Sequence, residues 1–234
     1  MWICAFALPV PTKEFYVNDF ADVIDSEDET HIVNVASQIA KETGAQIVVV
    51  TTETLEGMED EQYALMLGRE WGIGDENKDN GVLLLLSTGE RSLRIEVGLG
   101  LEGALPDGKC GRIMDEYIIP YFSDDSYSFG IKTGFDQIAY EVCKEYAINV
   151  PDGVSAAEMP EDDDDAITWV IIAIILLVII FSSFGKNTPT HRGGGFYPGG
   201  FYGGFRGGGF GGSSGGGFSG GGGSFGGGGA SRKF

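Results

Sequence analysis

Carboxylates and an amide stand on both sides of two strand-like segments near the middle of the sequence. Asp75, Asp79 and Asn80 precede the first segment, and Glu102 and Asp107 follow the second. Oxygen atoms of carboxylates and amides are the ligands that Ca²⁺ takes in proteins. If the chain brings the two groups together, they form a candidate divalent-metal site.

The spacing of Asp75, Asn77 and Asp79 matches the first ligands of an EF-hand calcium loop. An EF-hand itself is excluded, because its sixth position would be Asn80 instead of glycine and its twelfth would be Leu86 instead of glutamate. Two interpretations stay open. These oxygens hold one divalent cation, with Ca²⁺ the first choice, or the Asp-Asn-Gly sequence is turn chemistry that leads into a strand.

The two segments predict a β-hairpin that would position these residues. Gly81–Ser87 is an unbroken apolar run between turn residues, which indicates a strand buried on both faces. Ser92–Val97 alternates apolar and polar residues, which indicates a half-buried strand. The connection between them is short enough for a hairpin. We therefore expect the residues that flank the hairpin to meet at one end of the sheet.

Gly98–Gly103 matches the G-x-G-x-x-G pattern of dinucleotide-binding proteins. We reject that function because the preceding strand belongs to a hairpin and because Glu102 stands where a pyrophosphate would approach. The glycines are expected to provide positive φ angles and close approach of the backbone.

Charge is distributed unevenly along the chain. Residues 1–165 contain all 35 acidic residues and 10 basic ones, a formal charge of −25. Such a segment repels nucleic acid and anionic lipid headgroups. The sequence has two histidines and no Walker loop, serine nucleophile motif or zinc-ligand spacing. Hydrolytic chemistry would therefore have to use carboxylates and a metal-activated water.

The remaining periodicity predicts an α/β layered domain over residues 11–147, with a mixed sheet of few strands. Further expected elements are a strand at Gln46–Thr52 and helices that start near Ser26 and span Asp60–Trp71, Cys110–Ile119 and Tyr127–Tyr146. Cys110 and Cys143 are either paired or simply packed; the second interpretation is preferred.

The two ends of the sequence predict a membrane protein. Residues 1–7 are apolar and end in an A-x-A-like site, which is typical of a signal-peptide remnant, although a merely apolar start is the alternative. An acidic linker at 148–165 precedes 166–184, which has no charge and is long enough for a transmembrane helix. By the positive-inside rule, the domain is extracytoplasmic and the tail 185–234 is cytoplasmic. That Gly/Phe-rich tail is expected to be disordered, either as a tether or as a source of weak multivalent contacts.

Four stretches together resemble the TPM domain family: FYVNDFADVI (15–24), WGIG (71–74), DNGVLLLLS (79–87) and RIEVGLGLEGALPD (94–107). The resemblance implies an α/β/α sandwich around a small sheet, extracytoplasmic placement and divalent-metal binding. Plant members of the family are linked to photosystem II repair and to acid phosphatase activity. The resemblance places the family's site on five residues of this chain: Asp79, Asn80, Glu96, Glu102 and Asp107.

Two functions follow from these observations. The preferred one is a metal-binding interaction or maintenance module for membrane proteins. The alternative is a metal-assisted phosphatase that acts on phosphomonoesters, with Asp79, Glu96 and Arg112 as candidate catalytic residues. In that mechanism Asp79 and Glu102 hold the metal, the metal lowers the pKa of a bound water, and Arg112 steadies the phosphate.

Overall fold

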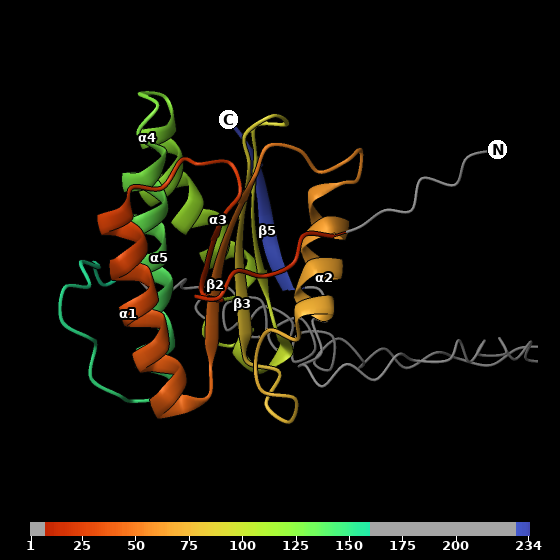
Figure 1. Ribbon diagram of the computed structural model, residues 1–234. Coiled ribbons are helices and arrows are strands. Elements are labelled where there is room, and N and C mark those ends of the chain that lie inside the picture. Colours follow the sequence, from red (N-terminus) through yellow and green to blue (C-terminus); the bar gives the residue numbers. More distant parts are fainter. Residues whose placement is uncertain (1–7, 160–227) are drawn as a thin grey trace, which may run out of the picture. The chain divides into compact units, whose positions relative to one another are not determined.

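A computed structural model describes residues 8–159 and 228–234. Five strands form one mixed sheet in the order β1–β2–β3–β4–β5. β1 to β3 run parallel, and β4 is antiparallel to both of its neighbours (Figure 1). The strands are β1 (Val17–Asp19), β2 (Gln46–Thr52), β3 (Gly81–Ser87), β4 (Ser92–Val97) and β5 (Gly228–Lys233).

Helices cover both faces of this sheet, so the predicted α/β layers are confirmed. α1 and α5 pack against each other on one face, and α2 packs against β3 and β4 on the other (Figure 1). The helices are α1 (Ser26–Thr43), α2 (Asp60–Trp71), α3 (Asp107–Ile113), α4 (Ile119–Phe122) and α5 (Tyr127–Glu145), with a 3-10 turn η1 (Leu99–Leu101) and a π turn η2 (Met114–Ile118).

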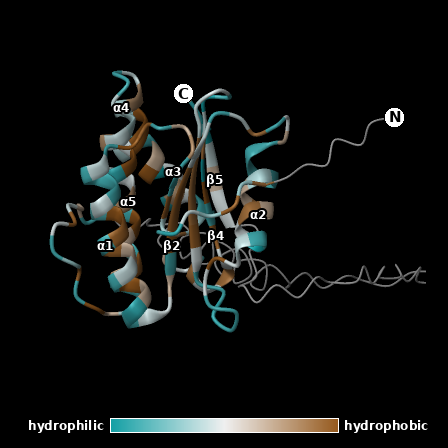
Figure 2. Cartoon of the chain, viewed as in Figure 1, coloured by the Kyte–Doolittle hydropathy of each residue, from teal (hydrophilic) through white to brown (hydrophobic). Residues whose placement is uncertain are grey.

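The core has two layers because successive strand residues point to opposite faces. Val48, Val50, Leu83 and Leu85 join the buried side of α2 in one apolar cluster. The other layer contains the buried apolar residues of α1 and α5, among them Ile32, Ile39, Phe135, Ile138 and Val142. Figure 2 shows hydrophobic residues among hydrophilic ones along these helices.

Most predicted elements are present, and one helix differs from the prediction at both ends. α1 ends at Thr43 and is capped by Gly44, whose φ of 81° is typical of a left-handed C-cap. Its N-cap is Asp25, which makes no side-chain hydrogen bond, and the helix starts at Ser26, as predicted. The helix predicted at Cys110–Ile119 starts earlier, at Asp107, and ends at Ile113, where η2 and then α4 continue the helical run past Pro120. The proline lies in the first turn of α4, where it gives up no helical hydrogen bond.

The prediction that β4 is half-buried is wrong, because all six of its residues are buried. α2 covers its polar face, and β5 pairs along its outer edge from Ser92 to Val97. β5 also corrects the expectation of a disordered tail for the last residues of the segment 185–234. β1 was not predicted from the sequence, because it is only three residues long.

Cys110 and Cys143 are both buried, unpaired thiols, which agrees with the packed interpretation. Burial raises the pKa of Cys110 to about 12 and that of Cys143 to about 11. Both groups are therefore protonated, inert parts of the core.

No helix within residues 8–159 and 228–234 is long and apolar enough to cross a membrane. The signal-peptide remnant at 1–7 and the transmembrane segment at 166–184 lie outside the described residues.

Candidate functional site

The two loops that flank the β3–β4 hairpin meet at one end of the sheet, as the sequence predicted. Gly98 donates its N–H to the carbonyl of Gly81 at 2.8 Å, and Gly100 donates to the carbonyl of Asp79 at 3.0 Å. A Cβ added at Gly100 would lie 1.9 Å from the carbonyl oxygen of Lys78. Close approach of the backbone thus explains this glycine, and neither Gly98 nor Gly100 has the positive φ that was also expected.

The polar groups that precede β3 hold their own loop together. Asp75 accepts a hydrogen bond on Oδ1 from the N–H of Asn77 at 2.9 Å. Asn80 is fully buried and accepts from the N–H of Asp75 at 2.9 Å. Its amide nitrogen donates to the hydroxyl of Tyr146 at 2.8 Å. This is the turn-chemistry interpretation of the Asp-Asn-Gly sequence, and Asp79 supports it with a φ of 49°.

Glu102 and Asp107 lie beside the start of β5. Asp107 accepts a hydrogen bond from the N–H of Gly229 at 2.7 Å. A Cβ added at Gly228 would lie 2.9 Å from Oε1 of Glu102. A shallow cavity of about 450 Å³ opens here, lined by Glu102, Pro106, Asp107, Gly108 and Gly228. Two of the predicted metal ligands therefore face a peptide segment from the far end of the sequence.

The predicted ligand set does not fit a divalent cation as the side chains are arranged. In the part of the chain that the structure describes, no group of three or more His, Cys, Asp or Glu side chains is placed to hold one. Asn80 has its oxygen and its nitrogen engaged within the protein, and Asp107 accepts a main-chain N–H. The loops meet as predicted, but the polar groups of Asp75, Asn80 and Asp107 bind protein atoms.

The proposed catalytic residue Glu96 lies in the interior, with no exposed surface. Arg94 donates to its Oε2 from Nε at 3.0 Å and from Nη2 at 2.6 Å. Oε1 of Glu96 has no hydrogen-bond partner among the described residues. Burial raises the pKa of Glu96, and the Arg94 guanidinium partly offsets that shift. A carboxyl in this position cannot contact a substrate from solvent, and Arg112, on α3, is half-buried.

Three further residues, which were not predicted from the sequence, surround β5. Asp60 begins α2, Asp115 lies in η2, and Arg91 lies in the β3–β4 connection. Each of them contacts a residue of 231–234. The available signal was charge, because the acidic domain and the basic tail are complementary.

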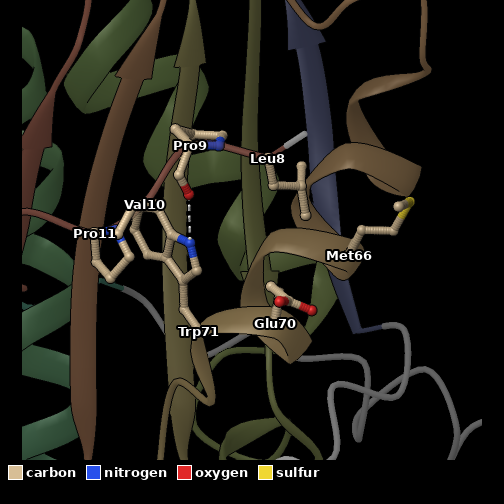
Figure 3. A pocket seen from close by; sticks show the side chains of 7 residues that line it. All are labelled: Leu8, Pro9, Val10, Pro11, Met66, Glu70 and Trp71. Atoms are coloured by element: carbon tan, nitrogen blue, oxygen red, sulfur yellow. Dashed lines mark hydrogen bonds between the residues drawn. The ribbon is translucent and has the colours of Figure 1, made fainter. Parts of the chain in front are cut away.

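A second cavity, of about 560 Å³, lies beside α2 and is lined by Leu8, Pro9, Val10, Pro11, Met66, Glu70 and Trp71 (Figure 3). The indole N–H of Trp71 donates to the carbonyl of Pro9 at 2.9 Å and holds the first described residues against the helix. Glu70 is the one titratable side chain among the lining residues, so this hollow has no set of catalytic groups.

Comparisons with known proteins agree with the fold. The family model described as TPM domain matches residues 17–141. A solved N-terminal domain of a protein from P. gingivalis is 30% identical, with a TM-score of 0.52, and the match covers 57% of this chain and 85% of that domain. No curated protein matched the chain.

Two further solved structures match at lower identity. An N-terminal domain from Corynebacterium glutamicum is 17% identical, with coverages of 66% and 93% and a TM-score of 0.43. The BA42 protein from Bizionia argentinensis is 18% identical, with coverages of 58% and 91% and a TM-score of 0.46. The family model spans more than half of the sequence, and this chain therefore belongs to the TPM domain family.

Proposed function

We propose that the TPM domain of this chain is a protein-interaction module whose carboxylates bind polypeptide, and that residues 166–184 hold it at a membrane. The observation that carries the proposal is the contact of Asp107 with the N–H of Gly229. A carboxylate that the sequence assigned to a metal is engaged by the main chain of a segment more than one hundred residues away. The acidic domain suits partners with basic, extended segments.

The competing function is the metal-assisted phosphatase. It needs a carboxylate that reaches the substrate, and Glu96 is enclosed between α2 and the sheet. It also needs free ligand oxygens, whereas Oδ1 of Asp75 and the amide oxygen of Asn80 each accept a hydrogen bond within their own loop. The interaction module requires neither.

Titration calorimetry and a phosphomonoester assay on the full chain separate the two functions. Wild type and Asp79→Ala are each titrated with Ca²⁺ and Mg²⁺ and then assayed with the same ions. The proposal predicts no hydrolysis in either protein. Metal-dependent hydrolysis that is lost in Asp79→Ala would establish the phosphatase and remove the proposal.

Membrane attachment has a consequence for topology. Pairing of β4 with β5 requires residues 92–97 and 228–233 to be on the same side of any membrane. A single crossing by residues 166–184 would place these two segments on opposite sides of the membrane. The expectation of a cytoplasmic tail implies that separation and therefore conflicts with the pairing. We therefore propose that the domain and residues 228–234 share one compartment, outside the cytoplasm.

Thiol labelling in cells tests this arrangement. Glu61→Cys and Lys233→Cys each place a thiol at an exposed position, with Cys4 replaced by serine. A membrane-impermeant maleimide should label both variants in intact cells. Labelling of the Glu61 position alone would restore the single crossing with a cytoplasmic tail.

A further inference from the structure

β5 joins the sheet from a distant part of the sequence. It pairs with the whole of β4, from Ser92 opposite Lys233 to Val97 opposite Gly228. Residues 160–227 lie between the domain and this strand, outside the described part of the chain. Without β5, the main-chain groups along the outer edge of β4 would be unpaired, and such an edge accepts an extended peptide by strand addition.

Side chains hold β5 in addition to its main-chain hydrogen bonds with β4. Ser231 and Arg232 make the first of these contacts. Ser231 donates to a carboxylate oxygen of Asp60 at 3.1 Å and accepts from Nη1 of Arg94 at 3.1 Å. Arg232 makes a two-pronged contact with Asp115, through Nε at 2.7 Å and Nη2 at 2.9 Å. Paired hydrogen bonds of this kind favour arginine over lysine.

Phe234 makes the third set of side-chain contacts between β5 and the domain. Its ring centroid lies 4.7 Å from that of Phe122 and 6.2 Å from that of Tyr127. The Arg91 guanidinium lies over the same ring, 4.9 Å from its centroid. Arg91 also donates from Nε to the main-chain oxygen of Phe234 at 2.6 Å. Arg91 thus recognises both the side chain and the backbone of this residue.

Two glycines shape the fit, one in the strand and one in α3. Gly229 has a φ of 145°, and a Cβ there would lie 2.1 Å from the carbonyl oxygen of Ile95. On the domain side, a Cβ at Gly111 would lie 2.6 Å from Nη2 of Arg232, so α3 leaves room for the arginine. The edge of β4 therefore suits a segment with glycine first, then serine and arginine, and an aromatic residue two positions after the arginine.

We propose that the β4 edge is a peptide-binding site, that residues 228–234 are its ligand within one chain, and that the same segment of a second copy binds there in exchange. The inference rests on the proposed function and names its ligand. Residues 160–227 separate β5 from the domain in the sequence, so the strand is not joined to β4 by a hairpin and can be exchanged between two copies. A tethered ligand competes strongly with a free one, so the edge is normally occupied by its own chain.

Peptide binding to an opened edge tests the proposal. The probe is a fluorescent peptide with the sequence of residues 228–234, GGASRKF. The receptor is the full chain with Arg232→Ala and Phe234→Ala, which remove the contacts of its own strand with Asp115 and with Phe122. We expect saturable one-to-one binding to this receptor in fluorescence anisotropy, and at least tenfold weaker binding to wild type. Lack of binding to the opened receptor would overturn the proposal.

A charge exchange identifies the site. Adding Asp115→Lys to the opened receptor should weaken the probe at least tenfold, and a probe with Arg232→Glu should bind that receptor better than the unmodified probe does. A probe with Lys233→Glu is the matched control, because the Lys233 side chain is exposed, and it should bind the opened receptor like the original. Failure of the exchange, or equal weakening by the control, would contradict the assigned site.

Folding of the receptor is measured by circular dichroism, with the single variant Asp115→Lys as a second way to weaken the strand. Retention of the helical signal in both is expected. Unfolding of both proteins would mean that the domain cannot fold without β5. That result would overturn the proposed exchange of this strand between two copies. The phosphomonoester assay above is independent of these outcomes, so the two proposals can fail separately.

Discussion

The loop end of the β3–β4 hairpin and the outer edge of β4 use carboxylates in different ways. At the loop end, the side chain of Asp75 accepts a hydrogen bond from its own turn. At the edge, Asp60 and Asp115 accept hydrogen bonds from a segment that arrives from the far end of the sequence. A row of acidic residues in a sequence therefore indicates where oxygens are, but the partner of those oxygens depends on which N–H groups the fold brings to them.

The largest effect is expected at the loop end, from Gly100→Ala. A Cβ there would lie 1.9 Å from the carbonyl oxygen of Lys78, so the two loops would have to separate. We expect a loss of about 3 kcal/mol in the free energy of unfolding, measured by urea denaturation. Gly103→Ala is the control, because no atom lies within 4 Å of the added Cβ. Equal losses in the two variants would refute the close-packing account.

Gly229→Ala transfers the same test to the edge. The added Cβ would lie 2.1 Å from the carbonyl oxygen of Ile95 at a φ of 145°, which should displace β5. Hydrogen exchange should then accelerate at least tenfold for β4 amides that bond β5, while β3 amides keep their protection. Accelerated exchange in β3 as well would mean that the sheet is one cooperative unit with its last strand.

Arg232→Glu sharpens the comparison by charge. The Arg232 and Asp115 side chains are 39% and 48% exposed, so solvent screens their attraction. We expect the reversal to lower the free energy of unfolding by about 1 kcal/mol, as for other partly exposed ion pairs. Lys233→Glu makes the same charge change at an exposed neighbouring position and should have an effect near zero. A larger loss in the free energy of unfolding for Lys233→Glu than for Arg232→Glu would contradict the assignment of the ion pair to Arg232.

The smallest effect concerns the interior of β4. Burial raises the pKa of Glu96, so the folded chain holds that proton at a pH where the unfolded chain has released it. Its contribution to stability is complete below the ordinary glutamate pKa and is lost as pH rises through the raised value. Glu96→Gln should flatten this part of the profile of urea midpoint against pH. An unchanged slope in Glu96→Gln would assign the pH dependence to another group.

Local pattern was sufficient to predict β2, β3, β4 and α2, because their apolar runs and alternation are strong. It also predicted that the loops around Asp79 and Gly100 meet, since a hairpin fixes that geometry. It could not reveal β5. Its sequence, GGASRK, lacks the β-branched and aromatic residues that mark strands. That strand is specified by its contacts with Asp60, Asp115 and Arg91, which no local window contains.

The same reasoning explains the errors at the site. Glu96 looked accessible because alternation suggested an exposed polar face on β4. α2 covers that face, and Arg94 on the same strand satisfies one of its oxygens. Asn80 looked like a ligand because of its neighbours, although its partner, Tyr146, lies at the end of α5. Long-range partners of this kind are outside the reach of spacing arguments.

The central claim is that this domain binds polypeptide at the β4 edge and not through the loop that contains Asp79. The most direct test is titration of the GGASRKF peptide onto the full chain with Arg232→Ala and Phe234→Ala, carrying in addition either Asp115→Lys or Asp79→Ala. We predict at least tenfold weaker binding with Asp115→Lys and unchanged binding with Asp79→Ala. Binding that is lost with Asp79→Ala and kept with Asp115→Lys would contradict the claim.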